Sequence, residues 1–147
     1  VQEYADRFGV RFYPGKRPWG IPCDLAIPCA IQNELDENDA AELIKNGCRY
    51  VIEGANMPTT QNAVHMLQEA KIIFAPGKAS NAGGVAVSAF EMEQNSAGRR
   101  WTADKVDATL RSVMTNIHTI CCDAAHQFGR PGNYQFGANV GGFIRVA

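Results

Sequence analysis

Short apolar runs alternate with amphipathic stretches through the first half of the chain. Residues 23–27, 49–52 and 71–74 are three such runs, and a proline or glycine follows each of them closely. Between the runs, apolar residues recur at helical spacing. Parallel strands require crossover connections of this kind, which are right-handed. The alternation therefore predicts an α/β fold with a parallel sheet and helices on its faces.

The N-terminal residues extend this pattern in one direction. We expect a first helix that ends at Gly9, followed by a short strand at residues 10–13 (VRFY) that Pro14 and Gly15 terminate. The sequence thus predicts four strands in all.

Two helices are expected between the later strands. The first spans residues 33–46, with Asn33 or Asp36 as its N-cap and Gly47 after its end, and either Thr59 or Thr60 caps the second. The apolar positions that we expect to face the core are Leu35, Ala40, Leu43 and Ile44 in the first helix and Ala63, Val64, Leu67 and Ala70 in the second.

Beyond Gly77 the pattern is helical throughout. We expect one helix from about 81–84 to Ala97, a long one from a Thr102 cap to Gly129, and a last one that opens near Gly137. A complete dinucleotide fold also needs an opening strand, a Gly-x-Gly-x-x-Gly turn and an acidic residue for the ribose, and the sequence has none of these. We therefore interpret residues 1–77 as the second half of a doubly wound, Rossmann-like domain, and 78–147 as helices that pack back on it.

The charge balance excludes two classes of function. With 14 basic and 15 acidic residues the formal net charge is −1, whereas binding to nucleic acid or a membrane surface requires a basic face. The five cysteines are odd in number and lack Cys-x-x-Cys spacing. They predict free thiols in a reducing cytoplasm rather than disulfides or a zinc site.

Two other patterns are interpreted as structural. His118, Cys122 and His126 are spaced four apart on the long helix, which places three potential ligands on one face. Their stripe adjoins an apolar one and no carboxylate motif accompanies them, so we expect packing and no metal. Lys78 lies in a Pro-Gly-Lys-Ala-Ser string, but Ile72 occupies the position where a phosphate-binding loop needs its first glycine.

The segments that follow the last three strands carry the candidate chemistry. In open α/β sheets, ligands bind beyond the carboxyl ends of the strands. All three segments are rich in small residues, and the last two contain Asn56 and Asn81. An asparagine amide offers both a donor and an acceptor, which matches a carboxamide such as that of nicotinamide. Taken singly, each segment is also explained as an ordinary turn.

Taken together, these segments resemble the glutamate dehydrogenases, within the Glu/Leu/Phe/Val dehydrogenase superfamily. The resemblance includes residues 22–30 (PCDLAIPCA), 53–60 (EGANMPTT), 74–78 (FAPGK), 81–88 (NAGGVAVS) and 137–143 (GANVGGF) in order and spacing. It covers essentially the whole chain and implies the cofactor-domain portion of a hexameric, small-subunit enzyme. The substrate domain and the first part of the cofactor domain are then expected upstream of Val1. Leucine, valine and phenylalanine dehydrogenases share the Asn-Ala-Gly-Gly string but usually not EGANMP, which favours glutamate.

The resemblance implies a role for six residues. Asn56 and Asn81 are expected beside the nicotinamide and its ribose, with Ala30 and Gly54 lining the cofactor cleft. On the next helix, the Ser88 hydroxyl is expected to donate to the side-chain carboxylate of glutamate. Val85, which shares a helical face with Ser88, is expected to form an apolar wall for the substrate.

The implied reaction is the reversible oxidative deamination of L-glutamate to 2-oxoglutarate and ammonium with NADP or NAD, and NADP is favoured. The activating lysine and the acid/base aspartate are expected upstream of Val1, so this segment has no catalytic residue and is inactive alone. The whole enzyme is expected to be a cytoplasmic homo-hexamer. Two alternatives are a non-catalytic module that binds a nucleotide or an amino acid, and a related Leu, Phe or Val dehydrogenase.

Overall fold

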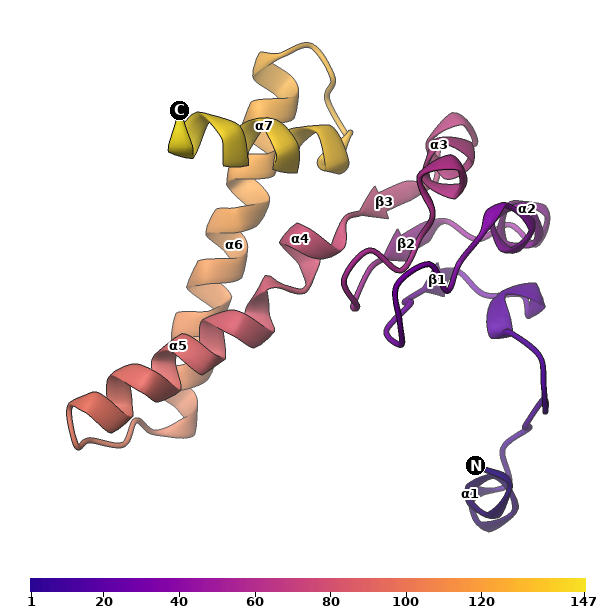
Figure 1. Cartoon of the computed structure of the whole chain (residues 1–147), viewed down its shortest axis with the longest axis horizontal. Coiled ribbons are helices and arrows are strands. Elements are labelled where there is room, and N and C mark those ends of the chain that lie inside the picture. Colours follow the sequence, from indigo (N-terminus) through magenta and orange to yellow (C-terminus); the bar gives the residue numbers. More distant parts are fainter.

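The computed structural model describes all 147 residues. Its sheet lies between a group of short helices and a long helical arm (Figure 1). In chain order the elements are α1 (Gln2–Phe8), the 3₁₀ turn η1 (Pro18–Gly20), β1 (Leu25–Ala26), α2 (Glu37–Lys45), β2 (Tyr50–Ile52), α3 (Gln61–Glu69), β3 (Ile73–Ala75), α4 (Gly77–Ser80), α5 (Ala82–Ser96), α6 (Ala103–Gln127) and α7 (Tyr134–Val146).

The three strands form a parallel sheet in the order β1-β2-β3, which confirms the predicted α/β class. Because successive side chains of a strand point to opposite faces, the central residues Ala26, Val51 and Phe74 lie on one face and are buried. Leu25 and Ile73 lie on the other face and stay exposed. In the view of Figure 1, α2 and α3 lie on one side of the strands, and α4 to α7 on the other. We call the strands with α2 and α3 the sheet part of the molecule, and α4 to α7 the helical arm.

The hydrophobic core is confined to the sheet and the elements that pack on it. Its twelve buried residues all lie between Trp19 and Phe74. Most of the predicted inward positions are buried, with Ile44 only partly buried and Ala70 exposed. Ala70 is exposed because α3 ends one residue before it, which makes it the C-cap. Leu43 and Leu67 are fully buried, and burial of each such side chain contributes about 1.5–3 kcal/mol.

Side-chain caps fix where α2 and α3 begin. The Asp36 carboxylate accepts the backbone N–H groups of Asn38 and Asp39, and the Asp39 side chain accepts the N–H of Asp36, which completes a capping box. The backbone N–H of Asp39, and after it the Arg17 guanidinium, hold the pKa of Asp36 below its usual value. Thr60 caps α3. Of the two candidates predicted for each helix, the structure thus selects Asp36 and Thr60. Helix α2 begins at Glu37 rather than at residue 33, so Leu35 is buried before the helix and not in it.

Two sequence-based expectations need correction. Residues 10–13 form no strand, because local β propensity cannot form one without a neighbouring strand to bond, and the sheet has only three strands. The preceding helix does end at Gly9, whose φ of 64° is left-handed. The last helix begins at Tyr134 rather than near Gly137, because the Asn133 side chain caps it by accepting the backbone N–H of Phe136.

The last two helices pack through small residues. Helix α7 crosses α6 (Figure 1), with Gly137 and Gly141 at the contact. A Cβ atom at Gly137 would lie 1.9 Å from the Cys121 carbonyl oxygen, and one at Gly141 would lie 2.7 Å from Ile120 Cγ2. Burial in this contact raises the pKa of the Cys121 thiol. The helices therefore approach each other more closely than side chains at these two positions would allow.

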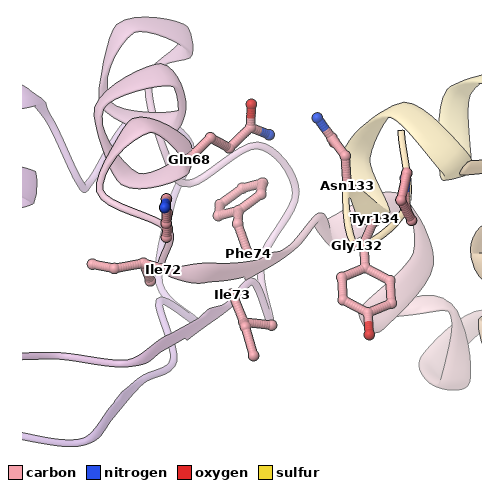
Figure 2. Close-up of a pocket in the computed structure, with 9 residues that line it drawn as sticks. Gln68, Ile72, Ile73, Phe74, Gly132, Asn133 and Tyr134 are labelled. Atoms are coloured by element: carbon pink, nitrogen blue, oxygen red, sulfur yellow. The ribbon is translucent and has the colours of Figure 1, made fainter. Parts of the chain in front are cut away.

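Helix α7 also contacts the sheet part of the molecule. The Gln68 amide at the end of α3 donates to Gln135 Oε1 at 3.0 Å. Figure 2 shows the adjoining cavity of about 280 Å³, which lies between Gln68 and Phe74 on one side and Asn133 and Tyr134 on the other. This contact places the carboxyl end of β3 between the two parts.

No helix is both long and apolar enough to span a membrane.

Candidate functional site

The segments after the three strands meet at the carboxyl edge of the sheet. The Pro28 carbonyl, in the segment after β1, accepts the backbone N–H of Gly54 at 2.8 Å and that of Ala55 at 3.1 Å, both in the segment after β2. An isolated parallel bridge joins Leu35 to Thr59 further along. Backbone hydrogen bonds therefore hold the first two segments together at the edge where ligands of open α/β sheets bind.

Two glycines make this approach possible. A Cβ atom at Gly54 would lie 2.4 Å from Cys29 Sγ, and a Cβ atom at Gly77 would lie 2.5 Å from the Ala55 carbonyl oxygen. A side chain at Gly77 would meet backbone and push the segments apart, and one at Gly54 would fit only if Cys29 Sγ moved aside. The edge is consequently formed largely by main chain.

A cavity of about 390 Å³ lies at this edge. All three segments contribute to its lining, which consists of Cys29, Ala30, Ile31, Gln32, Gly54, Ala55, Asn56 and Asn81. None of these side chains is an acid, a lysine, an arginine or a histidine. The four residues that the sequence assigned to the cofactor (Ala30, Gly54, Asn56 and Asn81) all line this cavity.

The two asparagines bond to each other across the cavity wall. Asn81 Nδ2 donates to Asn56 Oδ1 at 2.7 Å. Asn81 lies at the N-cap of α5, but its side chain does not cap that helix. The bond leaves the Asn56 amide donors, the Asn81 carbonyl oxygen and one Asn81 amide hydrogen for a ligand. The pair therefore presents a donor face and an acceptor face side by side.

Sequence reasoning assigned no role to Glu53, which lies between the segments. Glu53 is 5% exposed. Its Oε2 accepts the backbone N–H of Gly77 at 2.6 Å, and its Oε1 accepts that of Thr59 at 3.2 Å. The Ser80 hydroxyl donates to the Glu53 carbonyl oxygen. A carboxylate directly after an apolar strand was the sequence signal that could have identified it. An acid buried in this way needs nearby N–H groups to accept.

The two predicted substrate residues lie outside the cavity. Val85 and Ser88 follow Asn81 at helical spacing, so the three share one face of α5. Both are exposed, and Ser88 Oγ donates to the Gly84 carbonyl within the helix at 3.2 Å. At a rise of 1.5 Å per residue, Ser88 lies roughly 10 Å from Asn81 along the axis. The face thus extends from the cavity to Ser88.

The two patterns interpreted as structural carry other contacts. Lys78 Nζ donates to Asn139 Oδ1 on α7, which ties α4 to the last helix. Cys122 Sγ lies 3.5 Å from His118 Nε2, and the His118 ring packs against Tyr134. No group of three or more His, Cys, Asp or Glu side chains is arranged to hold a metal ion.

A parallel sheet with strand-end loops gathered at its carboxyl edge is the architecture of the doubly wound α/β domains. The chain belongs to the Glutamate/Leucine/Phenylalanine/Valine dehydrogenase family, whose model matches residues 1–147.

Similar proteins confirm the resemblance to glutamate dehydrogenases. The NADP-specific glutamate dehydrogenase of Escherichia coli (strain K12) is 51% identical over 147 residues, which cover 100% of this chain and 33% of that protein. The NAD-specific glutamate dehydrogenase of Clostridium symbiosum is 49% identical, with the same coverage. A solved glutamate dehydrogenase structure matches with a TM-score of 0.94 and 48% identity, over 99% of this chain and 33% of that one. The chain thus spans about a third of the length of the relatives it matches.

Proposed function

We propose that residues 1–147 form the part of an NAD(P)-dependent glutamate dehydrogenase that holds the nicotinamide end of the cofactor. The observation that carries the proposal is the bonded pair Asn56–Asn81 in the wall of a cavity at the carboxyl edge of the sheet. The names of the relatives support glutamate as the substrate and either NADP or NAD as the cofactor. In this proposal residues 1–77 complete the cofactor domain and residues 78–147 pack back on it.

The chemistry of the cavity fits a nicotinamide and its ribose better than a pyrophosphate. A pyrophosphate site needs positive charge or several converging backbone N–H groups, whereas this lining has no basic side chain. A carboxamide has one acceptor oxygen and two N–H donors, which complement the free donors of Asn56 and the free acceptor of Asn81. The apolar side of the cavity, which includes Ala30 and Ile31, suits the ring.

A nicotinamide held by these residues would supply the hydride acceptor for the oxidation of L-glutamate to 2-oxoglutarate and ammonium. Asn56 and Asn81 orient the ring by fixing its carboxamide. The face of α5 that bears Val85 and Ser88 receives glutamate beside the ring. Ser88 Oγ exchanges its bond to the Gly84 carbonyl for the substrate carboxylate, and that charge-assisted bond is the stronger of the two.

The chain supplies binding and orientation rather than proton transfer. The cavity contains no lysine, aspartate or histidine that could exchange a proton with the substrate nitrogen. We propose that these groups belong to the remaining two-thirds of the enzyme, and that the whole protein is a homo-hexamer in the cytoplasm. The length of the native gene product tests this against a free-standing binding module. A product of 147 residues would support the module, and one about three times as long would support the enzyme.

Kinetics of the full-length protein that carries these residues test the site itself. We expect Asn56→Ala and Asn81→Ala each to raise the cofactor KM by roughly tenfold, because each removes a ligand bond and leaves its partner amide unpaired. The double variant should be less severe than the product of the two, since the residues bond each other. Asn62→Ala, at an exposed position on α3, is the matched control. An unchanged cofactor KM in both single variants would reject the proposal, and faster turnover of leucine than of glutamate would reassign the substrate.

A further inference from the structure

Glu53 is a buried acid without a basic partner. It is 5% exposed. The basic residues of the four ion pairs are Arg17, Lys45 and Arg111, and none of them pairs with Glu53. A buried carboxylate is costly unless hydrogen bonds satisfy it. Here each carboxylate oxygen accepts one backbone N–H, from Gly77 and from Thr59. The acid is therefore stabilised by main chain alone.

The two N–H groups belong to different segments, and each segment carries one of the asparagines. Thr59 lies three residues after Asn56. Gly77 opens α4, and its carbonyl accepts the backbone N–H of Asn81 at 2.8 Å. One carboxylate thus bridges the segment after β2 to the segment after β3, directly behind the bond between Asn56 and Asn81.

The main chain of Glu53 adds one link to the end of β3 (Ile73–Ala75) and one to the segment that follows it. Its N–H donates to the Ala75 carbonyl at 3.0 Å, and its carbonyl accepts the Ser80 hydroxyl. Ser80 directly precedes Asn81. Glu53 therefore contacts the last residue of β3, the first residue of α4 and the residue directly before the asparagine.

We propose that Glu53 is a positioning residue, which holds the two asparagine-bearing segments at the separation where Asn56 and Asn81 bond each other and a nicotinamide. This inference rests on the proposed function. A carboxylate is required because both of its oxygens face N–H groups. A glutamine would turn its amide NH₂ toward one of them, so that a buried N–H would lose its acceptor.

The variant Glu53→Gln in the full-length enzyme tests the inference. We expect the Kd for reduced cofactor, measured by fluorescence titration, to rise roughly tenfold through the loss of one charge-assisted bond. The glutamate KM at saturating cofactor should change less than the cofactor Kd. In the Glu53→Gln background, Asn56→Ala should add little further effect, because the asparagine pair is already misplaced. If Glu53 only supported folding, the effects of the two substitutions on cofactor binding would instead multiply.

Asp36→Asn is the matched control, since Asp36 also accepts two backbone N–H groups but caps α2 away from the cavity. Because both N–H groups bond to Oδ1 of Asp36, which an asparagine retains, this variant should change the thermal unfolding temperature little and leave the cofactor Kd unchanged. If Glu53→Gln does not fold, Ser80→Ala removes one link while the carboxylate stays, and it should weaken cofactor binding by a smaller factor. The positioning role is overturned if Asn56→Ala weakens cofactor binding while Glu53→Gln, or Ser80→Ala in its place, does not. If Asn56→Ala also has no effect, the proposed function falls as well.

Discussion

The sheet part and the helical arm of the molecule are stabilised differently. The twelve residues of the hydrophobic core lie between Trp19 and Phe74, whereas α5 buries none of its 15 residues. The cofactor-side asparagines are held by segments that this core supports, and Val85 and Ser88 lie on the exposed helix. The position of the proposed cofactor site is therefore set by the buried core, and that of the substrate face by the geometry of α5 and its partly exposed contacts with α6.

The largest difference in stability is expected from a comparison of two leucines, one in each part. Leu67 on α3 is fully buried, and Leu110 on α6 only partly. We expect Leu67→Ala to cost about 2–5 kcal/mol of unfolding free energy, because the core cannot collapse around the cavity, and Leu110→Ala to cost about 1 kcal/mol. Thermal unfolding of the full-length enzyme measures both. Equal losses would show that the two parts are packed equally well.

A second test asks whether the helical arm has any tight contact of its own. Gly137→Ala puts a methyl group against the backbone of Cys121, so we expect a loss of about 1–3 kcal/mol from overpacking. Gly142 is the control on the same helix, since a Cβ atom there meets nothing within 4 Å. Gly142→Ala should stabilise α7 by roughly 0.5–1 kcal/mol. Similar thermal shifts for both variants would rule out close packing between α6 and α7.

Helix caps separate local stabilisation from packing. Thr60 and Thr102 each accept a backbone N–H at 3.3 Å, from Ala63 in the sheet part and from Lys105 in the arm. Because the cap geometry is the same, we expect Thr60→Ala and Thr102→Ala to cost about 1 kcal/mol each. Chemical denaturation can compare them. A cost at Thr60 several times that at Thr102 would mean that the cap also supports the core.

The smallest effect is expected at Thr59. Its hydroxyl is buried in the sheet part and has no hydrogen-bond partner. Thr59→Val keeps the shape of the side chain and the backbone N–H that Glu53 accepts, so the unfolding temperature should stay the same or rise slightly. Cofactor affinity should not change. A clear drop in stability would indicate that the hydroxyl has a partner after all, such as a bound water.

How far the sequence predicted the structure depends on the range of the interactions. Helical and strand periodicity identified the parallel sheet and inward residues such as Leu43, because those patterns are local. The strand at residues 10–13 was wrong because a strand also needs a neighbour to bond. The convergence of Asn56 and Asn81 was predictable, since both follow strands of one sheet. The bridge from Glu53 to Gly77 was not, because strand periodicity does not show which backbone N–H groups a side chain at a strand end reaches.

The glycines at the sheet edge limit how such a site can diversify. A side chain at Gly77 would collide with the Ala55 carbonyl, and one at Gly54 would have to displace Cys29 Sγ, so these two positions offer the least room for change. Larger or smaller side chains fit more readily at exposed positions of the lining, such as Ile31 and Gln32. Because NAD and NADP carry the same nicotinamide, exchanges at these positions would change how firmly the ring end is held and not which of the two cofactors is chosen.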